Sequence, residues 1–150
     1  AEKLSPIIAG KIKKAREDGA DVIFTLDTHG ENYLETSEGR HLPVPHCVKG
    51  TKGHELREEI NALVEPQDRI IEKPSFGSAE LFDILRGSGC TDIGLCGLVT
   101  DICVVSNAII AKTALPEANV TVDSAAVASF DKAKNDAALE VMKSVQVNVV

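Results

Sequence analysis

The alternation of two kinds of apolar segment constrains the fold of this sequence more than any other feature. Short β-prone runs alternate along the chain with segments whose apolar residues recur at helical spacing. The predicted strands are residues 21–27, 69–73, 91–97, 119–128 and 146–150. The predicted helices are residues 6–18, 53–64, 78–87, 101–115 and 131–144. Regular alternation of buried strands with helices indicates an α/β fold, with one parallel sheet covered by helices on both faces.

The length of the chain and its lack of internal divisions indicate a single domain. The chain has 150 residues, the size of one typical domain. It carries no repeat, low-complexity tract or linker, so we assign residues 1–150 to one domain. A helix at 6–18 would follow a strand in such a fold, and the sequence has no strand before it. The sheet predicted from these residues therefore lacks one member.

Charge, hydropathy and cysteine content argue against several classes of partner. The 16 basic and 23 acidic residues give a net charge of −7. This charge argues against nucleic acids and anionic membrane surfaces, because both attract clustered cations. No apolar run approaches the roughly 18–20 residues that span a bilayer. The four cysteines form no C-x-x-C pair and follow no secretory segment, so we predict reduced thiols in a cytoplasmic protein.

Reactive side chains follow three of the predicted strands. Asp27 ends the run VIFTLD, Lys73 ends RIIEK, and Cys103 lies just past IGLCG in the turn that begins a helix. In open parallel sheets, ligands bind outside the carboxyl ends of the strands. The sequence therefore predicts that a carboxylate, an amine and a thiol meet at one edge of the sheet.

Cys103 is the candidate nucleophile. Thr100 is the predicted N-cap of the helix after Gly97, and Cys103 falls in its first turn. A thiol there lies near the positive end of the helix dipole and near free backbone N–H groups, which stabilise a thiolate and can hold an oxyanion. An ammonium from Lys73 would lower the pKa of the thiol further. The alternative is that Cys103 is a small buried hydrophobic residue and Lys73 a solvated strand-end lysine.

Asp27, His29 and His46 form a candidate metal site. A D-x-H sequence at the end of a strand directs two ligands to one place, and the proline-stiffened PVPHC segment delivers a third. One carboxylate and two imidazoles suit Zn²⁺, Fe²⁺ or Mn²⁺ and leave positions for water or substrate. Glu35 or Glu38, in the loop between, is a candidate fourth ligand. The alternative is that both histidines are ordinary loop residues.

The remaining cysteines and histidines receive no site role. We assign Cys90 and Cys96 to packing, and Cys47 has no clear role. His41 and His54 lack evident partners in the sequence, so we predict that both lie at the surface.

Four segments resemble one known family. They read FTLDTH at 24–29, LPVPHCVKGT at 42–51, IEKPSFGS at 71–78 and CGLVTDICVVSNA at 96–108. In this order and spacing they are similar to the nicotinamidase/pyrazinamidase branch of the isochorismatase-like cysteine hydrolases, and they span most of the chain. The resemblance implies the three-layer α/β/α sandwich of that family, with a mostly parallel sheet and usually assembled as a homo-oligomer.

The resemblance also implies roles for individual residues. Cys103 matches the nucleophile of the family and Lys73 its catalytic lysine. The Leu98–Val99 peptide bond matches a cis bond of the family, which turns the N–H of Val99 toward the oxyanion hole beside the N–H of Cys103. The implied cofactor is a divalent metal ion, zinc first, with iron or manganese as alternatives. The metal ligands of the family correspond to Asp27, His29 and His46.

The activity implied by the resemblance is amide hydrolysis through a thioester. Cys103 would attack the carbonyl carbon of a small-molecule amide, ammonia would leave, and water would release the acid. Nicotinamide is the first candidate substrate, with its pyridine nitrogen on the metal. Another small amide or a carbamoyl compound is the second. Two other classes stay open: a metal hydrolase in which bound water attacks, and a non-catalytic binding domain.

The sequence departs from the family pattern in two places. The catalytic aspartate of the family lies on a first, central strand in a V-D-x-Q-x-D-F type motif, and this sequence has no such segment. We therefore expect the natural protein to begin upstream with that strand. The family also commonly holds the substrate ring between a Phe and a Trp, and the Trp position falls here in the stretch LPVP at 42–45. Tyr33 or Phe76 is the candidate replacement for these rings.

Overall fold

The computed structural model describes residues 3–150 as an α/β protein. Its helices are α1 (Ser5–Glu17), α2 (Ser37–His41), α3 (Glu58–Asn61), α4 (Ala79–Arg86), α5 (Val105–Ala114) and α6 (Lys132–Ser144). Its strands are β1 (Ile23–Asp27), β2 (Arg69–Lys73), β3 (Asp92–Leu98), β4 (Asn119–Ala128) and β5 (Asn148–Val149). Three further short helices are η1 (Tyr33–Glu35), η2 (Lys52–His54) and η3 (Thr100–Val104), of which η3 is a π-helical turn. All five predicted strands are present.

All strand pairs are parallel, and the strands form two sheets. β1 pairs with β2 from Ile23 opposite Arg69 to Asp27 opposite Lys73. β3, β4 and β5 form a second sheet in that order. The single sheet expected from the sequence is thus divided between β1 and β3, which are not hydrogen-bonded to each other. The further central strand implied by the family resemblance is not tested by these residues and stays a prediction.

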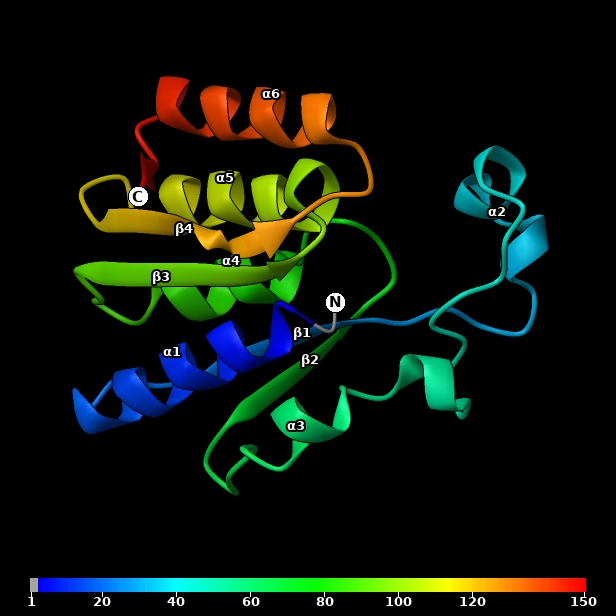
Figure 1. Ribbon diagram of the computed structural model, residues 1–150, viewed down its shortest axis with the longest axis horizontal. Helices are drawn as coiled ribbons and strands as arrows, with labels where there is room; N and C mark the ends of the chain where they lie inside the picture. Colours follow the sequence, from blue (N-terminus) through cyan, green and yellow to red (C-terminus); the bar gives the residue numbers. More distant parts are fainter. Residues whose placement is uncertain (1–2) are drawn as a thin grey trace.

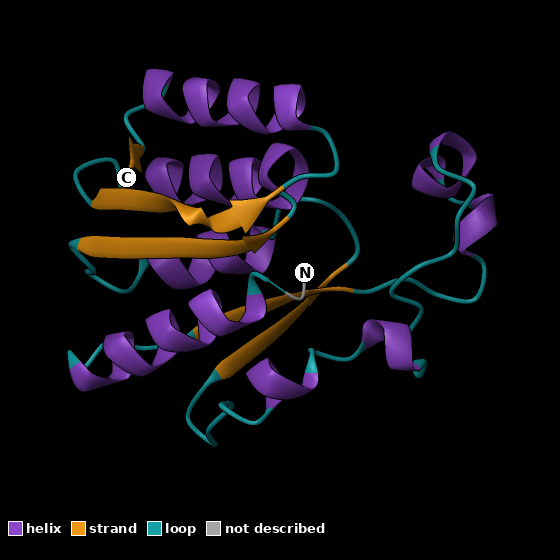
Figure 2. Ribbon diagram, viewed as in Figure 1, coloured by secondary structure: helices purple, strands orange, loops and turns teal. Residues whose placement is uncertain are grey.

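Two hydrophobic clusters lie between the helices and the strands, whose arrangement is shown in Figures 1 and 2. In the larger one, helices α4, α5 and α6 pack with β2 and β4; its fully buried members include Ile71, Ala108, Val120 and Met142. In the smaller one, Ile12 of α1 and Ile60 of α3 pack on Phe24 of β1. Helices therefore cover the strands from two sides, which confirms the expected three-layer α/β/α architecture.

One helix prediction needs correction. The helix predicted at 53–64 is reduced to η2 and the four-residue α3. The backbone is extended at Glu55 (ψ 149°) and at Arg57 (ψ 143°), and so short a helix is stabilised by the burial of Ile60 rather than by its own hydrogen bonds.

β3 is more exposed than its apolar sequence predicts. Residues along it alternate between exposed and half-buried, and Leu98 is 43% exposed. Cys96 of β3 and Cys90 before it are both exposed, so their assignment to packing is wrong. The physical reason at Cys96 is that β3 lies at the edge where the sheet divides. None of the helices in the described residues has the length and apolar character that a membrane-spanning helix needs.

Candidate active site and metal centre

The carboxyl ends of β1, β2 and β3 bring Asp27, Lys73 and Cys103 together. The Lys73 Nζ lies 3.2 Å from the Asp27 Oδ1 and 3.3 Å from the Cys103 Sγ. It also donates to the backbone carbonyl of Ser75 at 2.9 Å. The three N–H groups of the ammonium therefore each have a partner. These contacts hold the amine beside the thiol in the protein interior, since the Lys73 side chain is only 3% exposed.

Cys103 lies in the first turn after β3, as the sequence predicts, although the start of the helix differs. The N-cap is Val99 rather than Thr100, and Cys103 is part of the π-helical turn η3 that leads into α5. π-Helical turns inside helices occur frequently at functional sites. The Leu98–Val99 peptide bond is cis, which confirms the bond geometry that the resemblance implied.

The charges around Cys103 act on its thiol in opposite directions. Burial raises the pKa of the Cys103 thiol, the Lys73 ammonium lowers it, and the carboxylates of Asp27 and Glu38 raise it. Lys73 is therefore the group in the described chain that favours the thiolate. Burial is the largest of these effects and the pKa of the thiol is raised overall, so the contact of Lys73 with Sγ offsets part of that rise.

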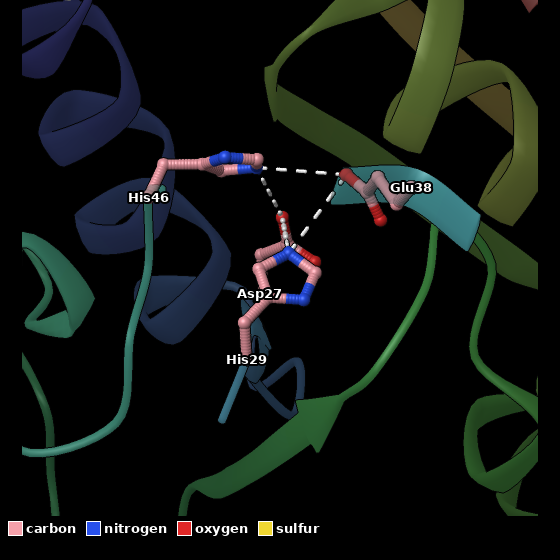
Figure 3. A group of neighbouring side chains, drawn as sticks. All are labelled: Asp27, His29, Glu38 and His46. Atoms are coloured by element: carbon pink, nitrogen blue, oxygen red, sulfur yellow. Dashed lines mark ion pairs between the residues drawn. The ribbon is translucent and has the colours of Figure 1, made fainter. Parts of the chain in front are cut away.

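Four side chains form a cluster whose ligand atoms lie within 4.8 Å of one another. The His29 Nε2 is 3.4 Å from the Asp27 Oδ2, and the His46 Nε2 is 3.5 Å from the Glu38 Oε1 (Figure 3). The structure thus brings together the three predicted metal ligands and selects Glu38 over Glu35 as the fourth member, since Glu35 is exposed and lies outside the cluster.

The cluster fits a divalent cation on two observations. The Nε2 of His29 is buried and has no hydrogen-bond partner, a costly arrangement unless another group uses its lone pair. Donor atoms bound to one zinc ion at about 2.0–2.2 Å lie about 3.4 Å apart, and the imidazole–carboxylate separations here are 3.4–3.8 Å. The Nδ1 of His46 donates to the Val44 carbonyl at 2.9 Å, which leaves its Nε2 free to act as a ligand.

Two residues that the sequence did not assign to the metal centre support it. Tyr33 is 1% exposed, and its ring packs edge-on against the rings of His29 and His46. The distances between ring centroids are 4.8 Å to His29 and 5.0 Å to His46. Its hydroxyl donates to the Leu42 carbonyl at 2.9 Å. Burial raises the pKa of Tyr33, and the nearby carboxylates raise it further. Tyr33 therefore orients the two imidazoles.

His54 is the second of these residues, and its prediction as a partnerless surface residue is wrong. The hydroxyl of Thr28 donates to the Leu26 carbonyl at 3.1 Å and lies 2.8 Å from the His54 Nε2. This contact with His54 holds Thr28, the residue between Asp27 and His29, in place. The signal for this contact was a histidine in a polar loop, but its partner is 26 residues away in the chain and no local pattern connects the two.

Comparison with known proteins identifies the family. The chain matches the isochorismatase domain over residues 1–150. It belongs to the isochorismatase family. This isochorismatase domain resembles the pyrazinamidase/nicotinamidase of Streptococcus mutans, with 26% identity and a TM-score of 0.87 over 100% of this chain and 86% of that one. The membership confirms the family expected from the four sequence segments.

Two further solved structures are similar to this isochorismatase domain. The pyrazinamidase of Pyrococcus horikoshii in complex with zinc is 30% identical, with a TM-score of 0.79 over 99% of this chain and 85% of that one. The N-carbamoylsarcosine amidase of Thermoplasma acidophilum is 27% identical, with a TM-score of 0.79 over 99% and 82%. Together with the family match, they confirm the expected class of enzyme, a hydrolase of non-peptide amide C–N bonds.

Proposed function

We propose that this isochorismatase-family hydrolase cleaves small carboxamides through a thioester on Cys103, with nicotinamide as the first candidate substrate. The observation that carries the proposal is the contact of the Cys103 Sγ with the buried Lys73 ammonium, 3.3 Å away. A cation beside a thiol favours the thiolate, which is the nucleophilic form, whereas packing of a structural thiol requires no such contact. The proposal is further supported by the likeness to the S. mutans enzyme, described as a pyrazinamidase/nicotinamidase.

The proposed reaction has two steps. In the first, the Cys103 sulfur bonds to the amide carbon, the C–N bond breaks, and the thiol proton leaves with the nitrogen as ammonia. In the second, water adds to the thioester carbon, the C–S bond breaks, and the acid and the free thiol are released. Lys73 is in hydrogen-bond contact with Sγ, so we assign it the stabilisation of the thiolate and of the departing sulfur. The catalytic aspartate implied by the resemblance stays a prediction for a further strand.

The oxyanion of the tetrahedral intermediate requires fixed donors. We assign this role to the backbone N–H groups of Val99 and Cys103, as the family resemblance implies. Cys103 lies in the first turn of a helical segment that continues through α5, where the helix dipole is positive. Fixed donors of this kind account for a large part of the rate of acyl-transfer enzymes.

We assign the metal centre to Asp27, His29, His46 and Glu38. Their donor set of two imidazoles and two carboxylates suits zinc, with iron or manganese as alternatives, and the P. horikoshii pyrazinamidase is described in complex with zinc. A bound metal ion would supply a Lewis-acid site that orients the ring nitrogen of the substrate. The residues of this chain hold that site beside Cys103, since Asp27 contacts both His29 and Lys73.

A carbamoyl compound is the second candidate substrate. The likeness to an N-carbamoylsarcosine amidase supports it. So does the stretch before His46, where Leu42 and Val44 are about half exposed and no aromatic ring is present to stack on a pyridine. Tyr33 does not replace that ring, because its own ring is buried against the two histidines. Phe76, which is 42% exposed, remains the candidate.

We also propose that the protein acts on a small-molecule amide as a cytoplasmic homo-oligomer. All four cysteines are free thiols, which a reducing compartment preserves. Apolar side chains that are left exposed, among them Phe130 at 98%, are consistent with contacts between copies. Light scattering after size-exclusion chromatography tests the oligomer, and a monomer at micromolar concentration would contradict it.

The test of the function is ammonia release by a full-length form of the protein, with the expected upstream strand, loaded with zinc. Nicotinamide, pyrazinamide and N-carbamoylsarcosine serve as substrates, and Cys103→Ala serves as the control for the nucleophile. We expect at least one amide to release ammonia in the parent chain and none in the variant. Release that persists in Cys103→Ala would support attack by metal-bound water. Absence of release from all three amides would support a non-catalytic domain.

A further inference from the structure

Asn107 lies next to the site and the proposed chemistry does not use it. It is on α5, one turn after Cys103, and is 5% exposed. Its amide is fully hydrogen-bonded: Oδ1 accepts from the Ser78 N–H at 3.0 Å, and Nδ2 donates to the Cys103 carbonyl at 2.9 Å and to the Phe76 carbonyl at 3.3 Å. One donor faces the oxygen and two acceptors face the nitrogen, so this network fixes the orientation of the amide.

The partners of Asn107 belong to different parts of the divided sheet. Phe76 and Ser78 follow β2, the strand that ends at Lys73, whereas Cys103 follows β3. The two strands lie in separate sheets. Asn107 therefore ties the segment after the lysine directly to the turn that carries the thiol.

Gly77, which lies between Phe76 and Ser78 in the sequence, also indicates that the segment after β2 is held close to α5. A Cβ built at Gly77 would lie 2.6 Å from the Ile110 Cδ1 and 3.5 Å from the Ser106 Cβ, both on α5. The absence of a side chain lets the loop lie close against the helix. Ser78 in turn caps α4 by accepting from the Leu81 N–H at 3.1 Å, so the loop is anchored on its other side as well.

We propose that Asn107 is a positioning residue that holds the Lys73 ammonium against the Cys103 thiol across the two sheets. The catalytic importance of Asn107 rests on the proposed function. The contact between the Lys73 ammonium and the Cys103 thiol does not depend on which substrate is cleaved. The Lys73 amine also donates to the Ser75 carbonyl at 2.9 Å. A shift of the segment 75–78 would therefore move the amine with it and lengthen its distance from the thiol.

The experiment compares the alkylation of Cys103 by iodoacetamide in the full-length parent chain and in Asn107→Leu, which keeps the size of the side chain and removes its hydrogen bonds. Peptide mass spectrometry separates Cys103 from the other cysteines, and the pH of the reaction is varied. The charged groups that act on the Cys103 thiol are Lys73, Asp27 and Glu38. We expect alkylation at neutral pH to fall about tenfold and its midpoint to rise by about one pH unit. Thr113→Ala is the control, because its hydroxyl also bonds to a backbone carbonyl of α5 and should leave the profile unchanged.

A folded Asn107→Leu chain with the parent profile would overturn the proposal. Circular dichroism and thermal unfolding establish whether the variant folds. If it does not, Asn107→Ser provides the test, because its hydroxyl can keep one of the bonds; a shift in the same direction supports the proposal, and an unchanged profile overturns it. If the parent chain cleaves none of the amides, these profiles still decide the role of Asn107. If it cleaves one, kcat should fall in Asn107→Leu with KM unchanged.

Discussion

The metal cluster and the thiol–lysine pair are held in two different ways. All four residues of the cluster lie within positions 27–46, and the ring of Tyr33 and the loop around them maintain their arrangement. Lys73 and Cys103 are 30 residues apart and follow strands of separate sheets. The cluster is thus a property of one segment, whereas the thiol–lysine pair depends on how the two sheets are joined. Asp27 contacts both His29 and Lys73 and links the two regions.

The largest expected effect comes from Cys103→Ser, which should separate the two regions. Amide hydrolysis should fall by more than about 1,000-fold, because removing a nucleophile eliminates the covalent route. Zinc binding, measured by equilibrium dialysis, should stay at the parent level, since Cys103 is not in the cluster. Cys90→Ser, at an exposed cysteine, is the matched control. A joint loss of activity and zinc would show that the two regions are not separable.

Lys73→Met should have the next largest effect, on the reactivity of the thiol. The Lys73 ammonium lowers the pKa of the Cys103 thiol, so its removal raises that pKa and leaves less thiolate at neutral pH. We expect alkylation of Cys103 at neutral pH to fall about 10–100-fold and the profile to move to higher pH. Lys49→Met, at an exposed lysine paired with Glu72, is the control. A profile that moves to lower pH would reverse the assigned role of the lysine.

Glu38→Gln tests the cluster itself. Loss of one carboxylate should weaken zinc binding about tenfold or more, because the amide carries no charge. Glu35→Gln changes an exposed carboxylate outside the cluster in the same loop and should leave zinc binding unchanged. Equal effects of the two substitutions would mean that the loop contributes only its overall charge.

Tyr33→Phe should give the smallest effect and should act on stability. The variant loses the hydrogen bond to the Leu42 carbonyl and keeps the ring against the histidines. We expect the free energy of unfolding to fall by about 0.5–1.5 kcal/mol. Tm should fall by about 2–4 °C for each kcal/mol lost. Thermal unfolding measures this change. A fall in zinc affinity larger than that of Glu38→Gln would place the hydroxyl, rather than the ring, at the centre of the cluster.

The sequence predicts most of the fold because its strands and long helices carry strong apolar periodicity. The failures have physical causes. The segment 53–64 has helical spacing, but its backbone is extended at Glu55 and Arg57, and tertiary burial of Ile60 matters more there than helix propensity. The division of the sheet between β1 and β3 could not be predicted from the periodicity. An apolar run has the same pattern whether or not its strand is hydrogen-bonded to a neighbouring strand.

The candidate site, like the fold, could be predicted only in part from sequence patterns. The strand-end rule brings Asp27, Lys73 and Cys103 together because it follows from topology. The choice of Glu38 over Glu35 depends on the geometry of the loop, which no local pattern encodes. Asn107 was missed because an asparagine on an apolar helix has no signature of its own; only its three hydrogen bonds reveal what it does.

The most direct test of the central claim is a search for the acyl group on Cys103 during turnover. The zinc-loaded chain is mixed with the amide that it cleaves fastest, quenched in acid, digested and examined by mass spectrometry. The account predicts that the peptide containing Cys103 gains the mass of the acyl group, that hydroxylamine removes it, and that Cys103→Ala shows neither adduct nor ammonia. Ammonia release by Cys103→Ala at the parent rate would contradict the claim that this thiol performs the reaction.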